Sequence, residues 1–353
     1  MIIDLPSTTT SHLNKKLVEL RERGGAVALG RVLTLVIVAD DDDKLEDAIE
    51  AANEASREHP SRVIVVAKGA RTAAPRIDGQ IRVGGDAGAS EVIVLRLYGQ
   101  LASQGQSAVV PLLLPDAPIV AWWPGGGPKN PAEDPIGELA QRRITDSAAE
   151  KSPVRALTAR SKSYVEGDTD LAWTRLTYWR AQLVSALDLP PYEKITGATV
   201  VGEADSPSTE LLAGWLAECL KVPVKRVKSS SAQGIISVTL QRRTGDIDLT
   251  RPDGRVGTLT QPGQPTRRIA LQRRDNKDCL IEELRRLDPD EVYETALHGL
   301  GKITSGHAKA AEEAKPAPKT DKTVTAADAP VRGKGPTKAP VKKSAKVAEK
   351  SSS

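Results

Sequence analysis

The chain has 353 residues, a formal net charge of +4 at pH 7, 39% apolar residues and 27% charged residues, as expected for a soluble protein with two domains and a tail. It contains no run of about 18 apolar residues, which excludes a membrane-spanning helix. The first six residues lack the basic and apolar regions of a secretory signal, so we expect a cytoplasmic protein.

The first half of the sequence predicts alternating helices and strands. Leu13, Leu17 and Leu20 recur at helical spacing. The runs 32–39 and 62–67 are continuous and rich in β-branched residues, as in strands buried on both faces. A helical pattern lies between them, so the three segments predict a βαβ unit and a parallel sheet. Further apolar runs are predicted to extend this sheet at 91–97, 109–114 and 118–123.

One long helix is predicted next. Residues 167–170 supply its cap, and Trp173 and Trp179 lie on its apolar stripe. Pro190 and Pro191 end it. We therefore predict a first domain at residues 1–190, an α/β domain of three layers with a mainly parallel sheet, which closes with this Trp-bearing helix.

The pattern then changes to that of an α+β domain at residues 191–304. A strand at 196–201 and a leucine-rich helix precede short alternating strands, which turn signals such as Arg251-Pro252-Asp253-Gly254 separate. This spacing predicts an antiparallel meander. Two helices complete the domain, and Asp288 is the predicted cap of the second.

Residues 305–353 are predicted to form a disordered basic tail rich in Ala, Lys and Pro, because they lack the apolar surface needed for folding. The tail holds eleven Lys/Arg and five Asp/Glu, or +6, so the rest of the chain carries about −2. A nearly neutral body argues against nucleic acid as its main ligand. Weak nucleic-acid binding through the tail remains an alternative.

The sequence lacks recognisable machinery for catalysis. The position where a dinucleotide-binding domain needs a glycine-rich turn holds Asp40 to Asp43, which we interpret as a helix cap rather than a magnesium site. Residues 84–88 are glycine-rich and predict a hairpin, and His59 suits a helix C-terminus. Cys219 and Cys279 are isolated, which favours packing roles over a redox-active pair. No catalytic, cofactor or metal site is predicted.

Aromatic and arginine side chains are the candidates for protein binding. Trp122 and Trp123 are adjacent in a strand, so they face opposite sides, and Arg175 and Tyr178 lie on the predicted helix away from its Trp stripe. Such residues carry binding energy at interfaces. The alternative for the tryptophans is a place in the core.

Several segments resemble the OpcA family of glucose-6-phosphate dehydrogenase assembly proteins, in particular its high-GC Gram-positive branch. They are TLVIVAD (34–40), AANEASREHPSRVIVV (51–66), LPDAPIVAWWP (114–124), RRITDS (142–147) and GDTDLAWTR (167–175). The match extends from Met1 to about Leu300. These segments add Arg142, Arg143 and Asp168 to the candidate partner-binding residues.

The resemblance implies a non-catalytic activator that binds glucose-6-phosphate dehydrogenase and favours its active oligomer, at the start of the oxidative pentose phosphate pathway. It supplies no catalytic residues. Two alternatives stay open: an α/β sensor of a sugar phosphate or dinucleotide, and a nucleic-acid-associated protein that acts through its tail.

Overall fold

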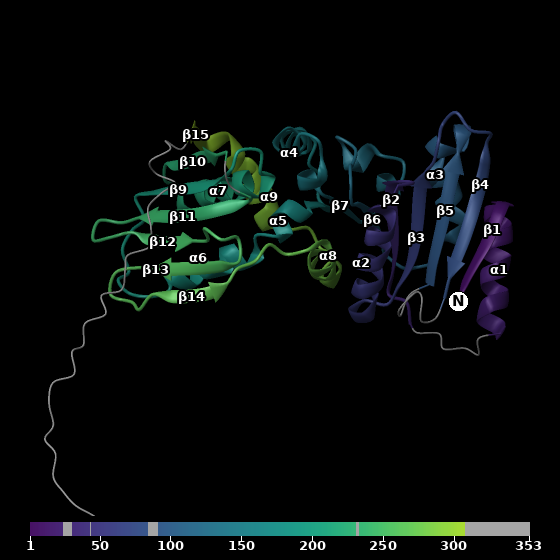
Figure 1. Cartoon of the computed structure of the whole chain (residues 1–353), viewed down its shortest axis with the longest axis horizontal. Helices are drawn as coiled ribbons and strands as arrows, with labels where there is room; N and C mark the ends of the chain where they lie inside the picture. The colour runs from purple at the N-terminus through teal and green to yellow at the C-terminus, as the bar shows by residue number, and fades with distance from the viewer. Residues whose placement is uncertain (24–29, 43, 84–90, 231–232, 308–353) are drawn as a thin grey trace, which may run out of the picture. The chain divides into compact units, whose positions relative to one another are not determined.

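A computed structural model of the protein describes residues 1–23, 30–42, 44–83, 91–230 and 233–307. The described residues form one compact unit with two β-sheets (Figure 1). Within the described ranges, no helix is both long and apolar enough to cross a membrane.

The N-terminal sheet has eight strands in the order β1-β4-β5-β3-β2-β6-β7-β8. The six strands β5, β3, β2, β6, β7 and β8, in this order across the sheet, are parallel to their neighbours. Strand β4 is antiparallel to both β1 and β5. The predicted, mainly parallel sheet is therefore confirmed. The bounds are β1 (Ile2–Thr8), β2 (Leu33–Asp40), β3 (Ser61–Lys68), β4 (Arg76–Arg82), β5 (Glu91–Tyr98), β6 (Ile119–Trp123), β7 (Arg142–Thr145) and β8 (Asp168–Asp170).

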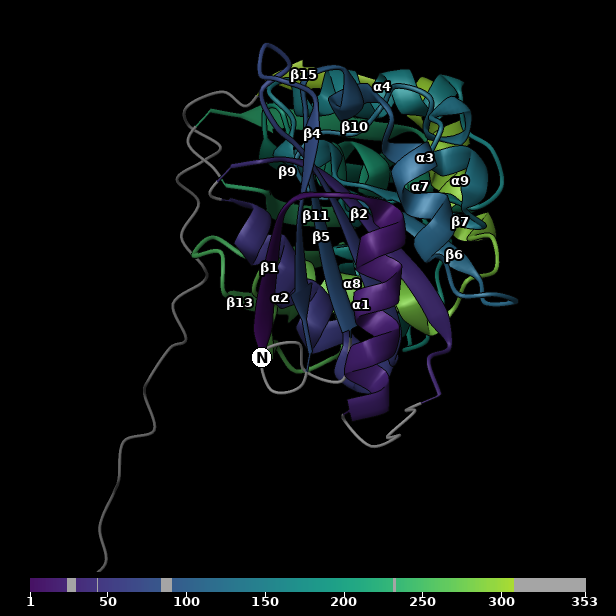
Figure 2. The same cartoon turned by 90° about the vertical axis from the view of Figure 1, so that its right-hand side faces the viewer.

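Helices cover both faces of this sheet because its central strands are apolar on both. In β2, Leu35 and Ile37 pack with α2 (Lys44–Glu58), which presents small alanines to the sheet. Val36 and Val38 point to the opposite face, where α1 (Thr10–Arg23) and α3 (Gly105–Val109) pack. In Figure 2, α1 crosses in front of the sheet.

The C-terminal sheet has seven strands in the order β14-β13-β12-β11-β9-β10-β15. Strands β11 to β14 form the predicted antiparallel meander. Strands β9, β10 and β15 are parallel, which the sequence analysis did not predict. The bounds are β9 (Gly197–Glu203), β10 (Val224–Ser229), β11 (Ile235–Gln241), β12 (Ile247–Thr250), β13 (Val256–Thr260), β14 (Arg267–Ala270) and β15 (Ile303–His307).

Two helices pack on the sheet of the other predicted domain. Cys279, Leu280 and Leu284 of α8 (Asn276–Arg285) pack in the core of the N-terminal sheet, beside α2. Conversely, Trp179 and Leu183 of α6 (Thr177–Leu187) belong to the core of the C-terminal sheet. The remaining helices are α4 (Pro153–Lys162), α5 (Leu171–Thr174), α7 (Pro207–Leu220) and α9 (Glu291–Gly299).

Three predicted elements need correction. The run 109–114 is no strand, because its first four residues end α3 and form a 3-10 turn, where Pro111 has no N–H to offer a sheet. The predicted long helix is two helices, α5 and α6, separated at Arg175 and Leu176. Asp290, rather than Asp288, caps α9 by accepting from the N–H groups of Val292 and Tyr293.

The predicted tail begins too early in the sequence. Ser305, Gly306 and His307 belong to β15, which pairs with β10. The rest of that segment, 308–353, lies outside the described residues, as does the glycine-rich segment 84–88. Strands β4 and β5, on either side of the latter, are antiparallel neighbours.

Candidate functional site

Three of the segments singled out in the sequence meet at one edge of the N-terminal sheet. Strands β6, β7 and β8 are parallel neighbours, and β8 leads directly into α5. Arginine and aspartate side chains from β7, β8 and the residues that follow them connect to α5, to α8 and to Asp288, which precedes α9. We call this set of buried polar contacts the polar junction. Its members are Arg142, Arg143, Asp146, Asp168, Asp170, Arg175 and Glu283.

Glu283 of α8 connects the two halves of the sequence within the polar junction. Its carboxylate accepts from Arg142 Nη2 of β7 at 2.5 Å and from Thr174 Oγ1 of α5 at 2.5 Å. Arg142 also donates from Nη1 to the Asp288 carbonyl at 2.8 Å. Arg142 and Glu283 are both buried, so neither charge has water as an alternative partner.

Arg143 and Asp168 form a second buried pair between β7 and β8. Arg143 Nε donates to Asp168 Oδ1 at 2.5 Å, and its two Nη atoms donate to the carbonyls of Ala140 and Glu166. Burial raises the pKa of Asp168, although Arg143 acts in the opposite direction. The pair fixes the segment that leads into β8.

Asp170 is fully buried at the end of β8 and caps α5. Its carboxylate accepts from Thr145 Oγ1, from the N–H and the hydroxyl of Ser147, and from the Ala172 N–H. Arg160 donates to the Ser147 hydroxyl at 2.9 Å. Burial, followed by the nearby Asp146, raises the pKa of Asp170. The sequence pattern predicts a cap here, but nothing in it marks this carboxylate as the centre of a hydrogen-bond network.

Arg175 occupies the end of α5 and binds Asp146 with both Nη atoms, at 2.8 and 2.7 Å. It also donates to Asn276 Oδ1 of α8 at 2.6 Å. Burial by itself lowers the pKa of Arg175, but the hydrogen bonds and charge of Asp146 outweigh it and raise that pKa. The planar guanidinium suits this two-point contact.

The polar junction is suited to holding structure rather than to transferring protons. Its carboxylates at Asp146, Asp168, Asp170 and Glu283 all accept several hydrogen bonds from neighbouring donors. A general base needs a free lone pair within reach of a substrate. In the described part of the chain, no group of three or more His, Cys, Asp or Glu side chains is placed to hold a metal ion.

The acidic segment after β2 has contacts that match its interpretation as a helix cap. Asp42 Oδ1 accepts from the N–H of Lys44, the first residue of α2, at 3.0 Å. Asp41 accepts from Arg96 Nε and from the Tyr98 hydroxyl. Asp43 lies outside the described residues.

The structure buries six of the seven candidate partner-binding residues. Trp122 and Trp123 are 0% and 1% exposed, and lie in the cores on opposite faces of the N-terminal sheet. Tyr178, by contrast, is 51% exposed on α6, with the Arg274 guanidinium 5.1 Å from its ring centre. For the two tryptophans this burial agrees with the alternative of a place in the core. The partner-binding role of the seven residues stays a prediction. The other buried members are Arg142, Arg143, Asp168 and Arg175.

Exposed apolar side chains continue from Tyr178 along α6. Val184, six positions later, is 46% exposed, and Tyr192, beyond the end of the helix, is 78% exposed. Tyr178, Ala181 and Val184 follow at three-residue intervals, so they lie along one side of the helix. We call Tyr178, Ala181 and Val184 the α6 stripe. Sequence periodicity placed Arg175 and Tyr178 on the side of the predicted helix away from its Trp stripe, and of the α6 stripe it singled out Tyr178.

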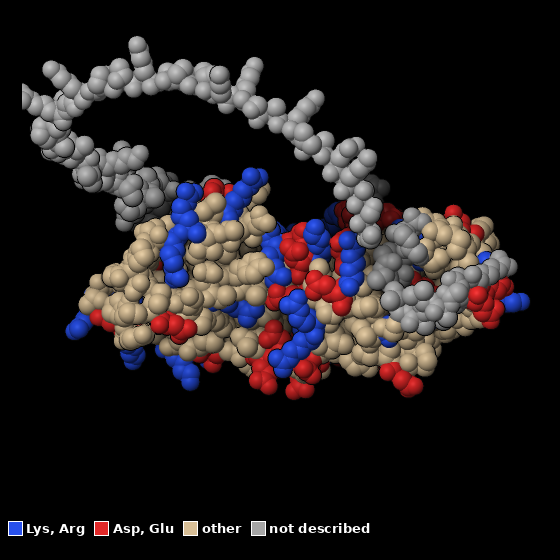
Figure 3. Space-filling model, turned by 90° about the horizontal axis from the view of Figure 1, so that it is seen from below, with Lys and Arg blue, Asp and Glu red and all other residues tan. Residues whose placement is uncertain are grey.

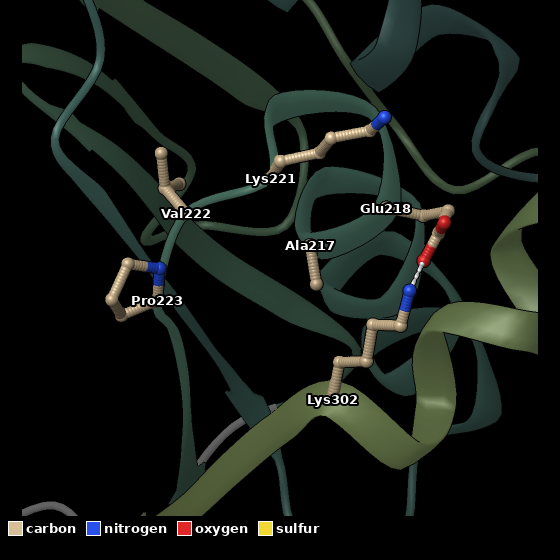
Figure 4. Close-up of a pocket in the computed structure, with 6 residues that line it drawn as sticks. All are labelled: Ala217, Glu218, Lys221, Val222, Pro223 and Lys302. Carbon is tan, nitrogen blue, oxygen red and sulfur yellow. Dashed lines mark hydrogen bonds and ion pairs between the residues drawn. The ribbon is translucent and has the colours of Figure 1, made fainter.

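A groove of about 530 Å³ lies at the C-terminal end of α7. Figure 4 shows Lys302 paired with Glu218, while the Lys221 ammonium group lies apart from that pair. Cationic side chains are favourable beside the last carbonyls of a helix. The lining residues are Ala217, Glu218, Lys221, Val222, Pro223 and Lys302.

Charged groups are mixed on the face seen in Figure 3. Acidic and basic side chains of the described residues interleave there, with uncharged areas to both sides. This distribution agrees with a body whose charges nearly cancel. Binding to a phosphate backbone requires a continuous basic surface, which this face does not present among the residues drawn in colour.

The two cysteines occupy different environments. Cys279 is completely buried, and burial raises its pKa to about 12. Cys219 is exposed near the end of α7, and its pKa is raised by partial burial and by Glu218. The thiolate is the reactive form of cysteine, so both shifts lower reactivity at neutral pH. A redox role for the pair stays a prediction.

We expect a thiol reagent at pH 8 to modify the native protein once, at Cys219. With a pKa of about 12, Cys279 has a thiolate fraction on the order of 10⁻⁴ at that pH, and its side chain is inaccessible. Intact mass and peptide mapping, before and after unfolding in guanidinium chloride, measure this. Modification of Cys279 in the native protein, or a Cys219–Cys279 disulfide after mild oxidation, would contradict it.

Comparison with known proteins identifies two family models in succession along the chain. Both describe a glucose-6-phosphate dehydrogenase subunit: the model of its N-terminal domain matches residues 52–162, and the model of its C-terminal domain matches residues 166–297. Together these ranges cover more than half of the chain. No curated protein matches it.

Solved structures show only distant similarity. A 3-ketoreductase from Actinomadura kijaniata has a TM-score of 0.39 and 9% identity, over 78% of this chain and 100% of the reductase. Glucose-6-phosphate 1-dehydrogenase from Mycobacterium avium has a TM-score of 0.37 and 9% identity, over 79% of this chain and 94% of the dehydrogenase. Similarity at this level carries no argument about function.

Proposed function

Because the chain belongs to the OpcA family, with both domains of a glucose-6-phosphate dehydrogenase subunit, we propose that it is a non-catalytic activator of that enzyme. The family places its role with glucose-6-phosphate dehydrogenase, at the start of the oxidative pentose phosphate pathway. The observation that carries the proposal is the succession of the two domain matches within one compact unit. From the resemblance of the sequence segments we further infer the high-GC Gram-positive branch.

The proposed mechanism is a shift in the population of the enzyme. A protein that binds the active oligomer more tightly than the inactive or dissociated forms draws the equilibrium toward activity. A tenfold difference in affinity corresponds to about 1.4 kcal/mol.

The direct test is to purify the dehydrogenase with and without this chain and to measure its activity and the mass of the complex. We expect a complex of defined mass and a higher specific activity or a larger share of active oligomer. The chain alone is expected to turn over neither substrate nor cofactor. Unaided turnover by the chain, or no binding and no change in the dehydrogenase, would refute the proposal.

The α6 stripe is the proposed contact surface. Tyrosine at the centre of an interface commonly contributes on the order of 2 kcal/mol, so Tyr178→Ala is expected to weaken the complex about tenfold or more. Val184→Asp is expected to weaken it further by placing a charge against an apolar contact. Titration of the dehydrogenase with each variant, followed by binding and by activity, measures the change.

Val110→Asp is the matched control for the α6 stripe. The exposed fraction of Val110 is 48%, similar to that of Val184. Val110 lies in the 3-10 turn after α3, in the N-terminal half. Its replacement should leave both affinity and fold unchanged. If Val110→Asp weakens the complex while Tyr178→Ala and Val184→Asp do not, the contact surface lies on the N-terminal half instead.

A further inference from the structure

A cavity of about 110 Å³ lies where the end of β9 meets the start of α7. Its apolar wall includes Trp179 and Ile235, and its polar wall contains three arginines, Arg175, Arg251 and Arg273. These arginines come from separate parts of the chain, at the end of α5, after β12 and after β14. The fold therefore concentrates positive charge around one small space.

Arg251 is buried in this wall without a carboxylate partner. It is 6% exposed, and its two Nη atoms donate to the carbonyls of Leu271 and Ile235, at 2.8 and 2.9 Å. Its Nε has no acceptor among the described residues. The ring of Trp179 lies 5.1 Å from the guanidinium carbon. A buried cation with only neutral partners is costly, so an anion in the cavity would stabilise it.

Arg273 is a second cation of the cavity wall, and no described residue is paired with it. It is exposed and lines the cavity, but it makes no hydrogen bond or ion pair with any described residue. Desolvation and the nearby charge of Arg175 lower the pKa of Arg273, and desolvation and Arg273 lower that of Arg251. Arg175 already binds Asp146, so Arg251 and Arg273 are the two guanidinium groups left to bind an anion.

The first turn of α7 adds backbone donors to the same cavity. Ser206 caps this 14-residue helix by accepting from the Thr209 N–H, and Pro207 has no N–H. The Ser208 N–H, at the second helical position, has no acceptor within the helix. The positive end of the helix dipole also favours a negative charge here.

Two acidic residues line the cavity as well, and their contacts assign them a different role. Glu203 accepts from the Gly234 N–H at 2.9 Å, and Asp205 accepts from the Val154 N–H at 2.9 Å. Each is therefore held by a backbone donor. Their remaining oxygen atoms can accept hydrogen bonds from hydroxyl groups beside an anion.

We propose that this cavity is a binding site for a phosphoryl group, held by Arg251, Arg273 and the first turn of α7. Guanidinium groups bind phosphate through paired hydrogen bonds. The volume is far below the roughly 300–1,000 Å³ of pockets that enclose a whole cofactor, so the ligand is inorganic phosphate or the phosphate end of a small ester.

Calorimetric titration of the full chain with inorganic phosphate, at ionic strength kept constant with sodium chloride, tests the site. Arg273→Gln is expected to weaken phosphate binding at least tenfold without changing the unfolding temperature in phosphate-free buffer, since Arg273 has no partner to lose. Arg243→Gln is the matched control, because Arg243 is also exposed in the C-terminal half but does not line the cavity.

A parallel titration with glycerol 3-phosphate distinguishes the two sources of the phosphoryl group. Tighter binding of the ester than of inorganic phosphate identifies a phosphate ester as the ligand, and the reverse identifies the free ion. The proposal is overturned if neither compound binds, if binding persists in Arg273→Gln, or if Arg243→Gln weakens it equally. Each outcome can be read without the dehydrogenase, so failure of this site leaves the proposed activator role untouched.

Discussion

Replacing Glu283 by alanine is expected to lower the free energy of unfolding by about 3–5 kcal/mol, because it leaves the buried charge of Arg142 without its partner. The change also removes the acceptor for the Thr174 hydroxyl. Glu283 lies on α8 and Arg142 on β7, 141 positions apart in the sequence, so we expect the packing of α8 on the N-terminal sheet to weaken. Denaturant unfolding, with cleavage near α8 by a low dose of protease, measures both effects.

The double variant Arg142→Met with Glu283→Leu separates the ion pair from simple packing. Replacing a buried pair by apolar side chains of similar size is often neutral or stabilising, so the double variant should recover much of the stability lost by either single change. Glu58→Ala serves as a control, because the Glu58 side chain is exposed and its ion pair with Arg285 lies at the surface. That pair should contribute less than about 1 kcal/mol to the free energy of unfolding. Additive losses in the double variant would contradict our account of the polar junction.

Trp122→Ala and Trp123→Ala are each expected to cost about 3–5 kcal/mol of stability, as large-to-small changes in packed cores do. The two side chains belong to different cores, on opposite faces of β6. Their losses should therefore be similar in size, while Tyr178→Ala at the surface changes stability little. Thermal and denaturant unfolding of the three variants makes the comparison.

The same variants decide between a core role and a binding role for the tryptophans. If Trp123→Ala keeps its stability but loses the dehydrogenase, Trp123 reaches the partner and the buried arrangement is not the one that binds. Because unfolded protein also fails to bind, affinity must be measured below the unfolding transition of each variant. The α6 stripe variants give the reference for a loss of binding without a loss of stability.

Elements with strong, local residue patterns could be predicted from the sequence. Strands β2 and β3 are predicted because β-branched residues fill consecutive positions, as required when both faces of a parallel strand are covered. The meander from β11 to β14 follows from short alternating runs between turn residues. Local patterns gave a wrong prediction for the run 109–114, whose apolar residues suggest a strand. Pro111 lies instead in a 3-10 turn.

The positions of the site residues, by contrast, could be seen only in the assembled fold. Arg142, Asp168 and Arg175 are charged, so as isolated residues they are expected at the surface. Their respective partners, Glu283, Arg143 and Asp146, lie far away in the sequence or on another element. Ion pairs that form across a fold leave no local period in the sequence. The phosphoryl site has the same origin, because Arg251 and Arg273 meet the start of α7 only when the C-terminal sheet is assembled. Periodicity reports which face of an element is buried, whereas the identity of the buried partner depends on which elements meet.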